Sequence, residues 1–287
     1  MSNETGLRKG LRDGCLGGGV SMAERFRLAH VGGFEGIELT LPAEGKFSLR
    51  ATEAERAELK RLAEDGMPIL CMNAGIPWEY SPAAIRDDVS RKGQDLVRQS
   101  IDLAVDIGVD TLLYIPGIVT ADQPFAQVWD KAQAVTEMLL AQAADARVTL
   151  AVENVWNALI LSPRDMVDFV DKFDSPYLRA YFDIGNVMQF GFPQHWIEAL
   201  EGARIARVHA KDFVVNPGGR LGFTQLLHGD VDWPATMTAL RQVGYVGWIT
   251  PEVDPSTADL EDWILELSSA MDSIIGYYGI QGPPMHV

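Results

Sequence analysis

The sequence is poor in cysteine and contains no long apolar run. Only two cysteines, Cys15 and Cys71, occur among the 287 residues. Two cysteines are too few for a disulfide framework, which favours a reducing compartment. No run approaches the roughly 18 apolar residues of a membrane span, and the polar stretch 1–13 lacks the apolar core of a signal peptide. We therefore predict a cytoplasmic protein with no membrane partner.

Basic residues are also few relative to acidic ones. The chain carries 24 Lys and Arg against 40 Asp and Glu, for a formal net charge of −16. Such a surface repels nucleic acid and anionic lipid, so we expect no nucleic-acid partner. The charge weighs only slightly against an anionic small molecule, because a local basic pocket can override the global field. No glycine-rich phosphate loop follows any predicted strand, and the triple glycine 17–19 is weak evidence for an anion site.

Apolar strand-like segments alternate with helical segments, each unit being close to 30 residues long. The predicted strands are 11–16, 36–39, 67–73, 110–115, 147–153, 178–183, 205–211 and 246–253. Alternation of this kind predicts parallel strands joined by helices, and eight such units close a (β/α)8 TIM barrel. We expect a single α/β domain over 1–287, with 1–9 as an N-terminal extension and 281–287 as a C-terminal tail. A doubly wound open sheet is the structural alternative.

Four of the predicted strands end at or beside a residue that can bind a divalent metal. These residues are Glu153, Asp183, His209 and Glu252, separated by 30, 26 and 43 residues. Barrel active sites lie at the C-terminal ends of the strands, so we expect the four side chains to converge. Taken singly, each has a structural explanation as a cap partner, an ion pair or a buried histidine. Together they predict a metal centre, whereas an open sheet would scatter them along one edge.

The alternation of faces along a strand predicts what surrounds this centre. On the fifth strand, Ala151 shares the axial face with Glu153, whereas Leu150 faces the helices. On the seventh strand, Arg207 would face the axis beneath the histidine. A buried arginine needs a partner, and Glu38 at the end of the second strand is the partner we expect.

Three carboxylates and one imidazole form an oxygen-rich donor set. Such a set suits one divalent ion, Mn2+ first, with Co2+, Mg2+ or Zn2+ as alternatives. The metal would act as a Lewis acid on a ketone and stabilise an enediolate. Glu153 and Glu252 come from strands three apart in the ring, so they can flank a substrate and transfer protons on its two faces. We predict that these two glutamates are catalytic as well as metal-binding.

Longer motifs surround the same residues. They are Glu153-Asn154-Val155-Trp156-Asn157, Tyr181-Phe182-Asp183-Ile184-Gly185-Asn186, Val208-His209-Ala210-Lys211-Asp212 and His228-Gly229-Asp230-Val231-Asp232-Trp233. They resemble the signatures of the xylose-isomerase-like TIM-barrel superfamily, in particular its sugar (phosphate) isomerase/epimerase branch. The resemblance covers nearly the whole chain. It implies the same four metal ligands, with the first and the last as the proton-transfer pair.

The chain also departs from that branch around the substrate. Asn186 stands where the ketose 3-epimerases have a histidine, and Arg220 is only the nearest match to their arginine after the seventh strand. His228 replaces an acidic residue, and these changes leave room for another keto-polyol. The predicted substrate-binding residues are Asn157, Trp156, Asn186, Lys211 and Arg220. Trp78 is a further candidate, although a core tryptophan is the more ordinary explanation.

These observations predict an enzyme: a divalent-metal-dependent isomerase or epimerase of a keto sugar or keto-sugar phosphate, acting through a metal-bound cis-enediolate. One alternative is a metal-dependent lyase or dehydratase acting on an inosose or 3-keto-glycoside. Another is phosphodiester hydrolysis of the endonuclease IV type, which the acidic charge disfavours. A non-catalytic sugar-binding subunit is a fourth interpretation. A homo-oligomer, either a dimer or a tetramer, is expected by analogy with other barrels of this size.

Overall fold

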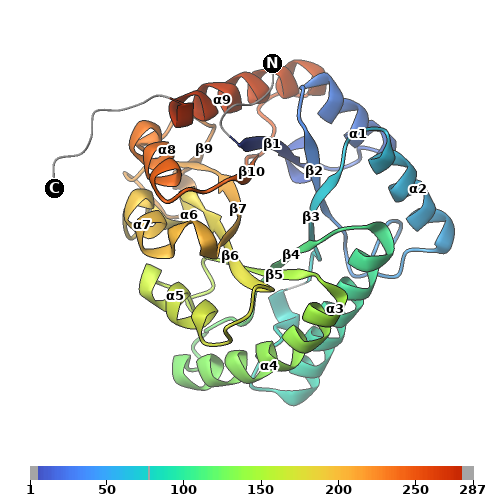
Figure 1. Ribbon diagram of the computed structural model, residues 1–287, viewed down its shortest axis with the longest axis vertical. Helices are drawn as coiled ribbons and strands as arrows, with labels where there is room; N and C mark the ends of the chain where they lie inside the picture. Colours follow the sequence, from blue (N-terminus) through green and yellow to red (C-terminus); the bar gives the residue numbers. More distant parts are fainter. Residues whose placement is uncertain (1–5, 77, 280–287) are drawn as a thin grey trace.

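The computed structural model describes residues 6–76 and 78–279, and its strands form a closed parallel barrel inside a ring of helices (Figure 1). The barrel strands are β1 (Leu7–Arg12), β2 (Gly36–Thr40), β3 (Ile69–Asn73), β4 (Thr111–Tyr114), β5 (Thr149–Glu153), β6 (Leu178–Asp183), β7 (Ile205–Ala210) and β10 (Gly247–Pro251). Around the ring they run β1-β10-β7-β6-β5-β4-β3-β2, and β1 pairs in parallel with β10 to close it. The predicted (β/α)8 barrel is confirmed.

The helices lie outside the strands. The long helices are α1 (Met22–Val31), α2 (Glu53–Glu64), α3 (Asp87–Ile107), α4 (Phe125–Ala146), α5 (Pro163–Asp171), α7 (Pro193–Arg204), α8 (Trp233–Gln242) and α9 (Leu260–Gly279). Four of the long ones, α1, α2, α5 and α8, begin at a side chain that caps the first turn. Thr52 and Ser162 form capping boxes with Glu55 and Asp165, which satisfy amide groups that the helix leaves unpaired. Within the described residues, no helix combines the length and apolar character needed to cross a membrane.

Short elements decorate the C-terminal end of the barrel. They are the 3-10 helices η1 (Asp13–Leu16), η2 (Trp78–Tyr80) and η3 (Gly219–Gly222), the one-turn helix α6 (Ile184–Val187), and the antiparallel pair β8 (Asp212–Phe213) and β9 (Phe223–Thr224). Sequence periodicity predicted none of them, because segments of two to four residues are too short to show a period.

The first strand was predicted wrongly. It begins at Leu7 rather than at residue 11, and the apolar residues that suggested a strand at 13–16 form η1 instead. Cys15 and Leu16 are buried there although they lie in a 3-10 turn, so an apolar run alone did not mark the strand. Residues 7–9, expected in an extension, therefore belong to the barrel. The predicted tail 281–287 lies outside the described residues.

The hydrophobic core has two layers, separated by the strands. Leu150 and Val152 belong to the outer layer between sheet and helices, whereas Ala151 lies inside the barrel in a cluster with Tyr181 and Leu113. This arrangement confirms the predicted faces of β5. Burying a leucine of the outer layer stabilises the fold by about 1.5–3 kcal/mol, so the helices hold the ring that carries the site.

Arg207 fills the barrel beneath the site, but the prediction of Glu38 as its partner was wrong. Its Nη2 donates to Asp110 Oδ1 at 2.9 Å, and its Nε donates to the carbonyl oxygen of Leu70 at 3.1 Å. Leu70 lies near the start of β3, on the far side of the ring from β7. The guanidinium therefore extends toward the N-terminal ends of the strands, whereas Glu38, the middle residue of β2, faces His209.

Candidate metal centre and active site

Four side chains converge where their strands end. Glu153 and Asp183 are the last residues of β5 and β6, His209 is the next to last of β7, and Glu252 directly follows β10. Each offers one ligand atom, and these atoms all lie within 4.8 Å of one another. Parallel register brings Asp183 opposite His209. The structure thus brings together the residues that the sequence separated by up to 99 positions.

The imidazole of His209 lies at the middle of this group. Its Nδ1 is 3.4 Å from Glu153 Oε1, 3.4 Å from Glu252 Oε2 and 3.9 Å from Asp183 Oδ2. The ring is fully buried, and Nδ1 forms no hydrogen bond of good geometry with any described residue. A buried nitrogen facing three carboxylates without such a bond is an arrangement that a shared cation would satisfy.

Glu38 orients the imidazole from the other side, a role that the sequence did not predict. Its Oε2 lies 3.1 Å from His209 Nε2, and Tyr181 donates its hydroxyl proton to the same carboxylate. Arg12 at the end of β1 lies 3.6 Å from Glu38 Oε1. A carboxylate at Nε2 favours the tautomer in which Nε2 carries the proton, and this leaves the Nδ1 lone pair available to a metal. The only sequence signal was an acid within an apolar strand.

Asn154 fixes the position of Asp183. Its Nδ2 donates to the Asp183 carbonyl at 2.9 Å, and its Oδ1 accepts from the Asp183 amide at 2.7 Å. These bonds extend the contact between β5 and β6 by one residue beyond Glu153. Asp183 Oδ1 in turn accepts from the amide of Asn186 at 2.8 Å, so Oδ2 is the oxygen that faces the other ligands.

The charges of the centre balance if one divalent cation is bound. Four carboxylates meet there, those of Glu38, Glu153, Asp183 and Glu252. Two side-chain cations oppose them: Lys211 Nζ lies 2.8 Å from Glu252 Oε2 and 3.2 Å from Asp183 Oδ2, and Arg12 Nη2 lies 3.5 Å from Glu252 Oε1. With a neutral imidazole, two negative charges are left over. Buried charge needs compensation, so the donor set fits a divalent metal ion.

Burial and neighbouring charges shift the pKa values of Asp183, His209 and Glu252. Burial raises the pKa of Asp183 to about 7, helped by the Glu252 and Glu153 carboxylates. Burial alone would lower the pKa of His209, but the Glu38 and Glu252 carboxylates outweigh it and raise that pKa to about 10. Burial opposes ionisation of Glu252 as well, yet Lys211 and His209 hold its pKa well below the ordinary value.

These pKa values predict that metal affinity rises with pH. A cation must displace the His209 proton at any pH below about 10, and below about pH 7 it must displace the Asp183 proton as well. The apparent association constant for Mn2+ should therefore rise about tenfold per pH unit between pH 7 and 8, and more steeply between pH 6 and 7. Competition with a fluorescent metal indicator measures this slope. A flat profile over pH 6–8 would contradict the proposed ligation by His209.

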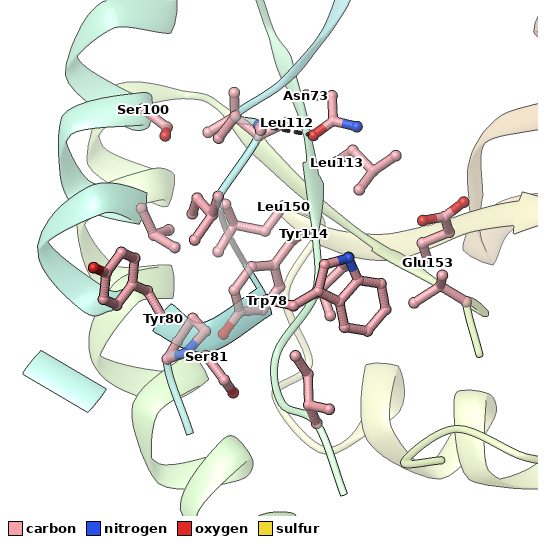
Figure 2. A pocket seen from close by; sticks show the side chains of 18 of the residues that line it. Asn73, Trp78, Tyr80, Ser81, Ser100, Leu112, Leu113, Tyr114, Leu150 and Glu153 are labelled. Atoms are coloured by element: carbon pink, nitrogen blue, oxygen red, sulfur yellow. Dashed lines mark hydrogen bonds between the residues drawn. The ribbon is translucent and has the colours of Figure 1, made fainter. Parts of the chain in front are cut away.

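A cavity of about 420 Å3 opens directly beside the centre. Glu153, Glu252 and Arg12 line it, and Figure 2 shows Glu153 there with Trp78 and Ser81 from the segment after β3 and with residues of β4. Trp78 is 50% exposed, so it is a cavity residue rather than a core tryptophan. The cavity gives a small molecule access to both glutamates.

The predicted substrate-binding residues lie in different places. Lys211 is part of the charge cluster, and Asn186 lies beside it, with its Oδ1 3.4 Å from Lys211 Nζ. Trp156 donates Nε1 to the Asn186 carbonyl and packs against Phe223, and it lines a separate cavity of about 200 Å3. Contacts from Lys211 and Asn186 stay predictions.

Asn157 and Arg220 differ most from that expectation. The Asn157 side chain is buried, donates to the Gly117 carbonyl at 2.9 Å and accepts from the Leu159 amide at 3.1 Å. Its amide therefore holds the loop after β5 and is not directed at a ligand. Arg220 is exposed on η3, and neither residue is among the described residues that line the 420 Å3 cavity.

Comparison with known proteins agrees with the observed fold. The family model described as xylose isomerase-like TIM barrel matches residues 26–274. The chain belongs to this family. The chain is 25% identical over 273 residues to L-ribulose-5-phosphate 3-epimerase UlaE of Salmonella paratyphi A. This match covers 89% of this chain and 93% of the relative.

Solved xylose isomerase-like barrels share the fold at lower identity. A D-tagatose 3-epimerase-like protein superposes with a TM-score of 0.76 at 18% identity, covering 94% of this chain and 98% of the other. The IOLI protein superposes with a TM-score of 0.81 at 12% identity, covering 96% and 100%, and its crystal structure holds a zinc atom.

Proposed function

We propose that this protein is a divalent-metal-dependent isomerase or epimerase of a keto sugar or keto-sugar phosphate. The main support for the proposal is that Glu153 and Glu252 take part in two features of the site at once. Both belong to the four-residue ligand cluster, and both line the 420 Å3 cavity in which a substrate would lie. The similarity to a relative named as a keto-sugar phosphate 3-epimerase supports the same reaction class.

The two glutamates can move a proton between the faces of a bound sugar. Removal of a proton beside the carbonyl gives an enediolate, and return of a proton to the opposite face inverts that carbon. Return to the neighbouring carbon would instead move the carbonyl group. Glu252 suits the carboxylate role, since Lys211 and Arg12 lie beside it and its pKa is low. Glu153, three strands away in the ring, would be the group that returns a proton on the other side.

We propose that Glu153, Asp183, His209 and Glu252 hold the metal, and that Mn2+ is the preferred ion because three of the four donors are carboxylates. When bound, such an ion supplies Lewis-acid stabilisation of developing negative charge. Glu38 keeps the histidine ligand oriented, and Asn154 holds the aspartate in place. Lys211 balances the charge of the two carboxylates that it contacts and lowers the pKa of both against the effect of burial.

Incorporation of solvent deuterium tests the proposal whatever the product. Purified protein with Mn2+ would be incubated in D2O with a panel of ketoses, inososes, keto-glycosides and their phosphates. We expect uptake of one deuteron next to the carbonyl of at least one sugar, without a change in composition. Net loss of water would instead favour the lyase or dehydratase. Absence of exchange across the panel would overturn the proposal in favour of a non-catalytic sugar-binding subunit.

A further inference from the structure

The cavity that contains the two glutamates extends beyond the interior of the barrel. Leu113 on its wall belongs to the inner core cluster, but other residues on the same wall belong to the outer layer between sheet and helices. Figure 2 shows the two ends, with Glu153 on one side and Ser100 of α3 on the other. We call the outer part the side chamber, which is lined by Val97, Ser100, Leu112, Tyr114 and Leu150.

The side chamber presents a hydrocarbon and aromatic surface. Its two hydroxyl groups already have partners: Tyr114 is bonded to Thr136 Oγ1 at 2.9 Å, and Ser100 Oγ donates to the Leu96 carbonyl at 2.7 Å. The other three lining side chains are aliphatic. A space with so few available polar groups binds apolar groups better than it binds water or hydroxyls.

The described residues that line the cavity also offer no free cation for a phosphate. Among its described lining residues, Arg12 is the only basic one, and it already lies within 3.6 Å of Glu38 and 3.5 Å of Glu252. Lys211 is likewise held between Asp183 and Glu252. A phosphate dianion placed here would face carboxylates without a cation of its own, and burial makes that arrangement costly.

Two residues that line the cavity, Trp78 and Ser81, could bind a ligand ring that carries a polar atom. Trp78 is half exposed and lines both this cavity and an adjoining one of about 490 Å3, so its face is open for stacking. Ser81 lines both cavities as well and is 4% exposed. Its hydroxyl has no hydrogen-bond partner among the described residues. A buried hydroxyl without a partner is rare in proteins and is satisfied here if a ligand oxygen reaches it.

We propose that the substrate is an uncharged keto sugar that carries an apolar substituent, and that this substituent occupies the side chamber. The proposal rests on the proposed function, because the sugar is placed at Glu153 and Glu252. The keto group lies at the metal centre, the substituent extends past Leu113 toward α3, and an oxygen of the ligand meets the Ser81 hydroxyl. The volume of about 420 Å3 lies within the range of roughly 300–1,000 Å3 typical of sites for drug-sized ligands.

A series of substituents tests this specificity without any variant. Dissociation constants of the Mn2+-loaded protein would be measured by calorimetry for methyl, butyl and phenyl 3-keto-β-D-glucosides. The phenyl compound should bind at least about tenfold more tightly than the methyl compound, since even one methylene in a fitted apolar pocket is worth about that factor. The effect of charge is tested by comparing L-ribulose with L-ribulose 5-phosphate. The phosphate group should not increase the affinity. Equal binding along the series, or tighter binding of the phosphate, would overturn the proposal.

A variant that fills the chamber localises the effect. Ser100→Phe should bring the phenyl-to-methyl ratio of dissociation constants close to one, whereas Val105→Phe, at a 52% exposed position of the same helix, should keep the ratio of the parent protein. Circular dichroism would show whether both variants fold. If Ser100→Phe folds and retains the preference, the substituent lies elsewhere and the proposal fails.

The two proposals fail in different ways. If deuterium exchange is absent for every sugar but the phenyl compound still binds more tightly, the enzymatic function is rejected and the side chamber stands as a binding site. If exchange occurs but the substituent has no effect on binding, the isomerase or epimerase stands and the substrate class proposed here is rejected.

Discussion

Replacing Glu153 or Glu252 with glutamine is expected to abolish exchange of the substrate proton with solvent. Glutamine keeps the shape of the side chain but can neither accept nor return a proton, and general acid–base catalysis is worth about 10²–10⁴-fold. We expect each single variant to lose at least about 100-fold in the rate of deuterium incorporation. The measurement is made at saturating Mn2+, because both residues also belong to the ligand cluster.

A control substitution of the same type, outside the site, shows whether the loss of deuterium exchange is specific to Glu153 and Glu252. Glu198 is exposed on α7, and Glu198→Gln should exchange like the parent protein. Circular dichroism and metal content would be recorded for all three variants. If a folded, metal-loaded Glu153→Gln or Glu252→Gln protein exchanged within a few-fold of the parent, that glutamate would lose its proposed role in proton transfer.

The second large effect is expected for metal binding. His209→Ala removes the central residue of the proposed ligand set and leaves Glu38 fully buried without the imidazole that now lies 3.1 Å away. Its affinity for Mn2+ should fall more than about 100-fold. Glu38→Gln keeps the ligand but weakens its orientation, and outer partners of this kind are worth about 10–100-fold in affinity. A smaller loss of Mn2+ affinity in Glu38→Gln than in His209→Ala would indicate that Glu38 positions the ligand and does not bind the metal itself.

Competition with a metal indicator gives the affinities, and the rise of the melting temperature with added Mn2+ gives an independent measure. His30→Ala on the exposed face of α1 is the control and should behave as the parent protein. If His209→Ala bound Mn2+ as tightly as the parent, the metal would not lie at the four-residue cluster. Equal losses for Glu38→Gln and His209→Ala would instead mean that Glu38 is itself a ligand.

The places where sequence reasoning failed have a common physical cause. The alternation of strands and helices is local, and capping boxes such as Thr52 with Glu55 span four residues, so both can be identified from adjacent positions. The start of β1 was misplaced because Cys15 and Leu16 are buried in a 3-10 turn, and burial alone does not distinguish a turn from a strand. The partner of Arg207 depended on the direction its side chain takes inside the barrel, which no local pattern encodes.

By itself, the sequence determined the parallel barrel and marked Glu153, Asp183, His209 and Glu252 as candidate metal ligands, because strand periodicity and residue type are properties of short segments. Only the tertiary structure decided that Glu38, 171 positions from His209, supports the imidazole. It also placed the Asn157 amide in a loop and opened a cavity lined by residues of both core layers. Those features depend on the closure of the barrel, which brings distant strand ends together and fixes which polar atoms find partners and which face the cavity.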